Sequence, residues 1–272
     1  MAAKSRLEGG YRLKGMPEIF SDKPLVTVIT VVFNGVDRLE NTILSIVGQD
    51  YENLEYIVID GGSEDGSVDV IRRYDDRIAY WLSEKDEGIY DAMNKGISLS
   101  NGEWLSFINC GDEFYNSHVL SSLKLTSVNV DMIIGRTRLT HGEEFSIIRP
   151  VINRYLLLIG NFICHQSVVI RRGMQETFDT RFSMLADYHL WLKALYREKR
   201  RYLVVDQVIA SYDATGYSSK DSDTWRKEEL AIKKELSWLA YCLSLIRQSL
   251  TRILPFISRL VQRILFRSRG SN

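Results

Sequence analysis

The sequence has few cysteines, no excess charge of either sign and no long apolar run. Its three cysteines, Cys110, Cys164 and Cys242, lie far apart and form no CxxC or Cys/His metal-binding spacing. That pattern argues against a disulfide framework or a zinc site and favours a reducing compartment. Lys plus Arg number 35 and Asp plus Glu also number 35, so the formal net charge is zero. A balanced charge gives no general case for nucleic-acid binding, and we expect none.

Targeting and membrane-spanning patterns are missing as well. Residues 1–21 are polar and mixed in charge, without the apolar core of a secretory signal peptide. No uncharged apolar run reaches the roughly 18 residues that suggest a membrane-spanning helix. With 45% hydrophobic and 26% charged residues, the composition is that of a globular protein with a sizeable core. We therefore expect a cytoplasmic protein of one large domain or two small ones.

From Pro24 onward, predicted strands and helices alternate. Residues 25–33 are β-branched and apolar enough for a strand that is buried on both faces of a parallel sheet. Further strands are expected at 54–59, 78–82 and 104–108, with helices at 38–47, 67–74 and 89–99. This spacing predicts a doubly wound α/β sheet, preceded by a mobile lead-in over residues 1–23.

Beyond Asp112 the pattern is less regular. The residues predict helices at 118–125 and 186–197, strands at 131–135, 161–172 and 202–208, a hairpin over 138–148, and loops at 178–182 and 215–220. From Thr224 the chain is expected to be helical almost to its end. No internal repeat or low-complexity tract occurs.

Two predicted strands end in acidic, glycine-containing turns, where ligands of open α/β sheets bind. The first turn, residues 60–66, has the sequence DGGSEDG. It is not GxGxxG and lacks a P-loop lysine, and an ordinary solvated turn is an equal alternative. The second, Asn109–Glu113, could bind Mg²⁺ or Mn²⁺ through Asp112, although Asp112 could instead cap a helix.

Two further polar positions are ambiguous on their own. His165 and Gln166 lie in an otherwise apolar segment, where a histidine is more often a satisfied core residue than a ligand. Asp187 lies at a predicted helix start, where an acid is favoured by the helix dipole alone.

Five ordered blocks of sequence resemble family 2 glycosyltransferases. They are Val28–Asn34, Ile57–Ser67, Asp86–Gly96, Gly102–Glu113 and Ala186–Asp187. These inverting enzymes have the GT-A fold and use sugar nucleotides to build bacterial polysaccharides. The SEKDEGIYDAMNKGI and FINCGD segments are similar to the colanic-acid, capsule and O-antigen subgroup. The resemblance covers about Pro24 to Lys220 and is specific because all five blocks occur in order.

The resemblance implies a role for each matching residue. It places Phe33, Asn34, Asp60, Ser63, Asp91, Asn94 and Lys95 around the nucleotide-sugar donor. Asp112 would hold a divalent metal, Mn²⁺ or Mg²⁺, on the donor diphosphate. Asp187 would be the general base for the acceptor hydroxyl, with His165 and Gln166 on the acceptor or diphosphate side. The loop at 216–220 would be a flap that excludes water from the donor.

The sequence departs from the family at two of these motifs. Asn109 and Gly111 occupy positions where the family often has acids, which leaves Asp112 with Glu113 beside it. The base motif is Ala186–Asp187 rather than Glu-Asp, so one supporting carboxylate is absent. A protein that binds nucleotide sugars but has weak or no catalytic activity is therefore the alternative. A nucleotidyltransferase is disfavoured because Phe33–Gly35 lacks a basic, glycine-rich loop.

The C-terminal segment has a different character. No Asp or Glu follows Glu235, whereas six arginines do. Apolar residues recur at spacings of four and three (Ile246, Leu250, Ile253, Ile257, Leu260 and Ile264), which predicts a basic amphipathic helix, kinked at Pro255. It could pack on the catalytic domain or lie on the anionic inner leaflet of the cell membrane. We expect a catalytic domain at 24–220, a peripheral membrane tail at 221–272, and a lipid-linked saccharide as acceptor.

Overall fold

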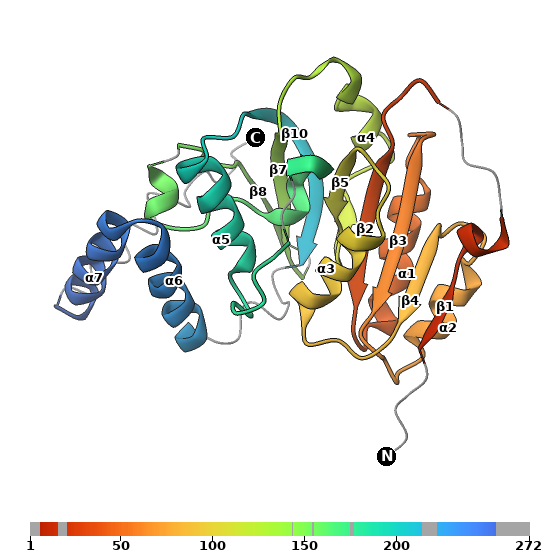
Figure 1. Cartoon of the computed structure of the whole chain (residues 1–272), viewed down its shortest axis with the longest axis horizontal. Helices are drawn as coiled ribbons and strands as arrows, with labels where there is room; N and C mark the ends of the chain where they lie inside the picture. The colour runs from red at the N-terminus through yellow and green to blue at the C-terminus, as the bar shows by residue number, and fades with distance from the viewer. Residues whose placement is uncertain are drawn as a thin grey trace.

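The structure is a computed structural model that describes residues 6–15, 21–142, 144–153, 155–174, 177–213 and 222–253. Its elements form a central sheet covered by helices, with two further helices at one end (Figure 1). The strands are β1 Leu7–Gly9, β2 Val26–Val32, β3 Leu54–Asp60, β4 Tyr80–Ser83, β5 Trp104–Phe107, β6 Glu113–Phe114, β7 Met132–His141, β8 Glu144–Ile148, β9 Val168–Arg171 and β10 Tyr202–Asp213. The α-helices are α1 Val36–Val47, α2 Ser67–Arg73, α3 Ile89–Leu99, α4 Val119–Ser122, α5 Ala186–Trp191, α6 Ser222–Leu236 and α7 Trp238–Ile253.

The strands of the described residues form one mixed sheet in the order β1-β4-β3-β2-β5-β9-β7-β10-β6, with β8 paired to β7. The four strands β4, β3, β2 and β5 run parallel, and β9 runs antiparallel to β5. The carboxyl ends of the parallel strands therefore meet at one edge, and the segment that leads into β9 starts at that same edge. This arrangement gathers the candidate site.

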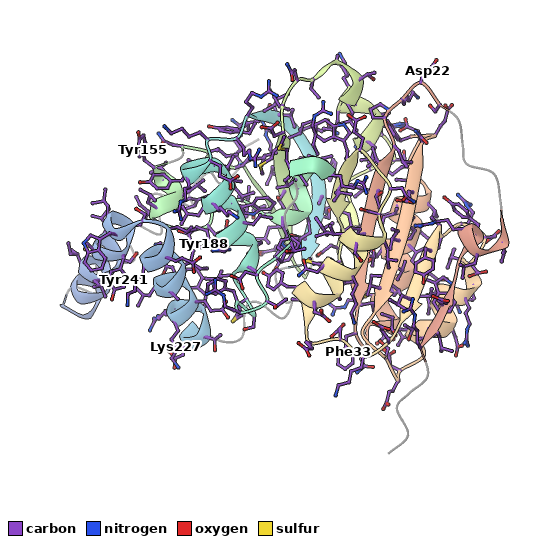
Figure 2. The ribbon with its side chains drawn as sticks, in the orientation of Figure 1. Asp22, Phe33, Tyr155, Tyr188, Lys227 and Tyr241 are labelled. Atoms are coloured by element: carbon purple, nitrogen blue, oxygen red, sulfur yellow. The ribbon has the colours of Figure 1, made fainter. Side chains whose placement is uncertain are left out.

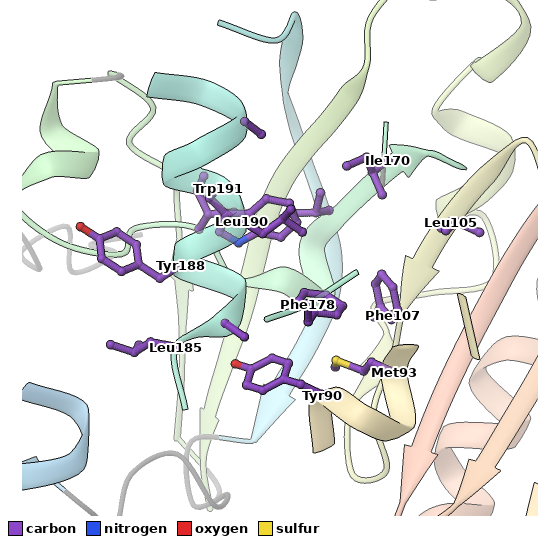
Figure 3. Packing of buried hydrophobic residues seen from close by; sticks show 14 of the residues in the cluster. Tyr90, Met93, Leu105, Phe107, Ile170, Phe178, Leu185, Tyr188, Leu190 and Trp191 are labelled. Carbon is purple, nitrogen blue, oxygen red and sulfur yellow. The ribbon is translucent and has the colours of Figure 1, made fainter. Parts of the chain in front are cut away.

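Alternate residues of the central strands enter two separate cores. Ile29 and Ile57 point to one face, where they belong to a core shared with α3 and α5. Val28 and Val58 point to the other face and pack in the core formed with α1, α2 and α4. Because both faces are covered, β2 and β3 are buried along nearly their whole length and are mostly apolar, as is typical of a buried parallel strand. Figure 3 shows the first core between α3 and α5, with Phe107 and Phe178 at its centre.

Most of the predicted elements are confirmed. The α/β alternation, the hairpin at 138–148 and the helices at 222–253 are all present. The helix expected at 186–197 consists of α5 followed by a π-helical turn, Leu192–Arg197. The strand expected at 202–208 extends to Asp213. The flap predicted at 216–220, and the tail beyond Ile253 with Pro255, lie outside the described residues.

Two predictions about local structure were wrong. Part of the expected lead-in, Leu7–Gly9, is strand β1 on β4, fixed by Asp75, which accepts hydrogen bonds from Gly10 N (2.6 Å) and Trp81 Nε1 (2.6 Å). The strand expected at 161–172 is confined to β9. Residues His165–Ser167 form a 3₁₀ turn instead, in which Ser167 N donates to Cys164 O (3.0 Å). Just before it, the Asn161 side-chain oxygen accepts a hydrogen bond from Ile163 N (3.1 Å), a local bond that competes with strand pairing.

Candidate functional site

The candidate site lies at the edge of the sheet where β2, β3, β4 and β5 end. Phe33 follows β2 directly, is 65% exposed, and projects from this edge (Figure 2). An exposed phenylalanine beside buried strands offers a flat apolar surface on which a ring could stack.

Asp60 ends β3 and is completely buried, with 0% exposure. Its Oδ2 atom accepts hydrogen bonds from Gly62 N (3.1 Å), Ser63 N (3.0 Å) and Ser83 Oγ (2.6 Å). Its Oδ1 atom is also buried, but has no hydrogen-bond partner among the described residues. Since a buried carboxylate oxygen is costly without a donor, Oδ1 is a ready acceptor for an N–H group of a ligand.

Asn34 and Ser63 link the ends of β2 and β3. Asn34 N donates to Ser63 Oγ (2.7 Å), and Glu64 N donates to Asn34 Oδ1 (2.9 Å). Asn34 has a positive φ of 49°, a conformation that asparagine tolerates better than most residues. The structure thus brings together three of the predicted donor residues, Asn34, Asp60 and Ser63.

The loop after β4 and the start of α3 contribute a second polar group. Lys95 Nζ lies 3.0 Å from Glu84 Oε1 and 3.3 Å from Asp91 Oδ2. Burial alone would lower the pKa of Lys95, but these two carboxylates outweigh it and raise the pKa. Predicted residues Asp91 and Lys95 are therefore paired with each other. Asn94 bonds instead to the backbone of Phe178, at N (2.7 Å) and O (2.9 Å), so its amide links α3 to that loop.

Asp86 lies between the two groups, although no separate role was predicted for it. Its Oδ1 accepts from Gly88 N (2.9 Å), and its carboxylate lies so close to Gly61 that a Cβ there would overlap it. Burial raises the pKa of Asp86, and the neighbouring charges of Asp91 and Asp60 raise it further.

The residues after β5 meet the turn that precedes β9. Gln166 Nε2 donates to Asp112 Oδ2 (2.7 Å), and Asn109 Nδ2 lies 2.9 Å from His165 Nε2. His165 Nδ1 in turn lies 3.5 Å from Asp187 Oδ2. If the Asn109 amide donates to Nε2, the imidazole carries its proton on Nδ1, facing Asp187. The predicted residues His165 and Gln166 thus connect the predicted base to the predicted metal ligand.

Asp187 lies in the first turn of α5 and is buried, with 7% exposure. Its Oδ1 accepts from Tyr188 N (2.7 Å) and from Tyr90 Oη (3.3 Å). Its Oδ2 has longer contacts, to Asn161 Nδ2 (3.4 Å) and to His165. Oδ1 is therefore the fixed oxygen, and Oδ2 is the one better able to accept a proton. Burial, together with the nearby Asp187 charge, raises the pKa of Tyr90 well above its usual value, so its hydroxyl remains a donor.

Metal ligands and nucleophiles are sparse at this edge. Within the described ranges, no group of three or more His, Cys, Asp or Glu side chains is arranged to hold a metal ion. Two groups nevertheless fit a metal ion. One is the Asp112 carboxylate, and the other is Asn109 Oδ1, which is buried and has no hydrogen-bond partner among the described residues. Mg²⁺ commonly takes only one or two protein carboxylates and completes its shell with water and substrate phosphates. Burial raises the pKa of Cys110 and of Cys164 to about 12, so neither is a thiolate nucleophile.

Tyr90 and Glu228 are the other site residues that the sequence did not single out, and Asn109 was named only as a departure from the family's metal motif. Tyr90 and Asn109 fall inside blocks of the resemblance, but their contacts with Asp187 and His165 become visible only in the folded chain. Glu228 accepts hydrogen bonds from the turn before α5, across more than 40 residues of sequence. No local pattern could have assigned it.

A mixed α/β sheet with acidic turns at its strand ends is the architecture of the GT-A nucleotide-sugar transferases. The chain belongs to glycosyltransferase family 2: the model described as Glycosyl transferase family 2 matches residues 27–183. It is 31% identical over 209 residues to the uncharacterized glycosyltransferase Rv1514c of Mycobacterium tuberculosis, covering 72% of this chain and 78% of the relative. The protein is a glycosyltransferase.

Solved structures agree on the fold. Staphylococcus aureus TarS 1-349, in complex with UDP, superposes with a TM-score of 0.61 at 15% identity, over 76% of this chain and 64% of that one. The present chain thus spans less than two thirds of that structure. The mannosyltransferase PcManGT of Pyrobaculum calidifontis, in complex with GDP-Man and Mn²⁺, gives 0.58 at 17% identity, over 88% of this chain and 79% of that one. Both likenesses support the GT-A fold that the sequence predicted.

Proposed function

We propose that the protein transfers a sugar, with inversion, from a UDP-sugar to a hydroxyl of a lipid-linked saccharide. The observation that carries this proposal is the pair of adjacent residues His165 and Gln166, which contact Asp187 and Asp112 respectively. Inverting transfer needs a base on one side of the sugar and charge neutralisation at the leaving diphosphate on the other. Two carboxylates joined through one turn meet that need.

The donor base would bind between β2 and β3. Asp60 Oδ1, which has no partner among the described residues, would accept an N–H of the uracil ring, and exposed Phe33 would cover one face of that ring. Ser63 and the ion-paired Asp91 and Lys95 would lie along the ribose and sugar. The TarS and PcManGT structures, with UDP and GDP-Man, support nucleotide recognition by this fold.

A divalent metal, Mn²⁺ or Mg²⁺, would be held by Asp112 together with the donor phosphates. When bound, it would neutralise the charge that develops on the departing diphosphate. The Mn²⁺ in the PcManGT complex supports this choice of ion. Gln166 would orient the Asp112 carboxylate toward the metal through its 2.7 Å hydrogen bond to Oδ2.

In the proposed reaction, the acceptor oxygen forms a bond to the anomeric carbon as the bond from that carbon to the diphosphate oxygen breaks. The electron pair of the broken bond leaves with UDP. The proton of the acceptor hydroxyl moves to Asp187 Oδ2, while Tyr90 and Tyr188 hold Oδ1 in place. His165 would stabilise the carboxylate through its Nδ1.

We assign the acceptor to a membrane because of the C-terminal helices. In α7, exposed apolar residues Trp238, Leu239, Leu245 and Ile246 recur at the spacing of one helix face, and six arginines but no acid occur after Glu235. A peripheral helix on the anionic inner leaflet has this composition. No helix among the described residues is long and apolar enough to cross a bilayer. The proposed pathway is exopolysaccharide, capsule or O-antigen synthesis.

Calorimetric titration with UDP and with GDP, each with and without Mn²⁺, tests the donor assignment. The proposal predicts that UDP binds more tightly than GDP, that Mn²⁺ strengthens binding, and that Asp112→Asn removes the Mn²⁺ effect. Tighter GDP binding would reassign the donor, and no binding of either nucleotide would contradict the proposal. The alternative, a protein that binds donor without turnover, predicts the same titrations but no UDP release in any acceptor assay.

A further inference from the structure

The turn before Asp187 is held by a side chain from the C-terminal helices. Glu228, on α6, is a buried carboxylate that accepts four hydrogen bonds. Its Oε1 accepts from Ser183 N (2.7 Å) and Ser183 Oγ (2.8 Å), and its Oε2 from Met184 N (3.0 Å) and Leu185 N (2.9 Å). Three consecutive backbone N–H groups at the entry to α5 are thus bound by one carboxylate, with charge-assisted hydrogen bonds.

The same turn is held from the opposite side by α3. Tyr90 Oη lies 3.0 Å from Met184 O and 3.3 Å from Asp187 Oδ1. Figure 3 shows Tyr90 on α3 below the start of α5, with Leu185 on the chain that enters the helix. The position of Asp187 is therefore set between α3, which belongs to the donor half of the sheet, and α6.

Helix α6 is itself fixed by a second buried group. Lys233 is completely buried, and its Nζ donates to Glu229 Oε1 (2.6 Å), Ser244 Oγ (2.8 Å) and Ile159 O (3.0 Å). The same ammonium lies 6.0 Å from the ring centre of Tyr188, the residue after Asp187. Helix α6 thus contacts the chain on both sides of Asp187: Glu228 binds the turn before α5, and Lys233 lies over the Tyr188 ring in α5.

We infer that Glu228 is a positioning residue for Asp187, and that α6 is part of the catalytic unit rather than of a separable tail. The inference rests on the proposed function, because it assumes that Asp187 is the base. The residue directly before Asp187 is Ala186, so the chain has no carboxylate at that position. Glu228 brings a carboxylate to the same turn from α6, which lies outside the segment 27–183 that matches the family model. With four donors, this carboxylate is saturated, so it stabilises the turn without competing for the acceptor proton.

Two substitutions of Glu228 give graded expectations. In Glu228→Gln the side-chain oxygen can still accept from Met184 and Leu185, but an amide group faces Ser183 N–H. In Glu228→Ala all four hydrogen bonds are lost. Because small misplacements of a catalytic group can lower rates by about 100-fold, we expect kcat to fall about 10-fold in Glu228→Gln and about 100-fold in Glu228→Ala. The KM for the donor and the Kd for UDP should change by less than about twofold, since Asp60 and Asp112 are untouched.

Glu235→Gln is the matched control, because it removes the same charge from the same helix at a half-exposed carboxylate that pairs with Arg181 and His189. Release of UDP from the full chain measures kcat, and hydrogen exchange measures protection of the amides of Ser183, Met184 and Leu185. The inference predicts faster exchange at these three amides, and a lower kcat, in both Glu228 variants but not in Glu235→Gln. An equal kcat in Glu228→Ala and wild type, or a loss of donor affinity that accounts for the whole effect, would overturn it. If wild type releases no UDP, the proposed function fails instead, and the hydrogen-exchange result still decides whether Glu228 orders the turn.

Discussion

Replacing Asp60 by asparagine isolates a single oxygen atom of the proposed donor site. Asparagine has nearly the same shape, so its side-chain oxygen can take the place of Oδ2 and keep the hydrogen bonds from Gly62, Ser63 and Ser83. Its NH₂ group then occupies the place of Oδ1, the buried oxygen that has no partner among the described residues. An acceptor for a base N–H becomes a donor that faces it.

The expected magnitude follows from that exchange. A hydrogen bond to a charged acceptor is worth about 1.5–3 kcal/mol, which corresponds to about 10- to 150-fold in the Kd for UDP. Folding should lose less, about 1 kcal/mol, because neutral hydrogen bonds replace charge-assisted ones at Gly62, Ser63 and Ser83. The new NH₂ group takes the place of an oxygen that already has no partner among the described residues.

Calorimetry of UDP binding and a thermal melt measure the two effects separately. Asp69→Asn is a suitable control, since Asp69 lies in α2 with a side chain that is 79% exposed and pairs with Arg72 (3.1 Å) on the same helix. An Asp60→Asn variant that binds UDP as tightly as wild type would refute the assignment of Oδ1 to the base. If Asp60→Asn does not fold, Ser83→Ala tests the same reasoning. It removes a donor to Oδ2 but leaves Oδ1 in place, so its UDP affinity should equal that of wild type.

Three further predictions concern the framework of the site. Lys233→Ala leaves the buried Glu229 carboxylate without its cation and should cost about 3–5 kcal/mol of unfolding free energy by denaturant titration; a loss below 1 kcal/mol would contradict the buried-pair account. Burial would raise the pKa of Asp75, but hydrogen bonds from Lys14, Trp81 and Gly10 outweigh it and lower the pKa. The stabilisation by these bonds is therefore complete above the ordinary pKa of 3.8 and is lost as pH falls through the lower pKa of the folded state, so amide exchange in β1 should accelerate selectively in acid. A ratio of β1 to β2 exchange rates that does not change with pH would argue against this. Gly61→Ala should displace the Asp86 carboxylate, cost about 1–3 kcal/mol and weaken UDP binding several-fold, whereas unchanged binding would separate Asp86 from the donor site.

The parallel half of the sheet was predictable because its local signals agree. Residues 26–32 and 54–60 are mostly apolar on both faces, a pattern that favours a strand covered on both sides. The turns that follow contain the polar residues that the strands exclude. The edge where Asp60 and Asp112 lie could therefore be derived from the chain order alone.

Contacts between distant segments could not be derived in that way. Strand β1 depends on Asp75 and Trp81, and its own three residues carry no strand signal. The turn at His165–Ser167 lies in a sequence that is apolar enough for a strand. The side-chain oxygen of Asn161 accepts from Ile163 N just before it, a local hydrogen bond that the apolar pattern does not reveal. Glu228 resembles any other acid of a helix until the fold places it against the entry to α5.

The central claim is that Asp187 is the base of a glycosyl transfer. It is tested most directly by incubating the full chain with a panel of UDP-sugars and a lipid extract from bacterial membranes, and measuring UDP release for wild type and Asp187→Asn. We predict release that depends on the extract in wild type, a rate at least about 100-fold lower in Asp187→Asn, and equal UDP affinity of the two proteins. Equal rates in the two proteins would contradict the role of Asp187, and UDP binding without release from any donor in wild type would identify a nucleotide-sugar-binding protein instead.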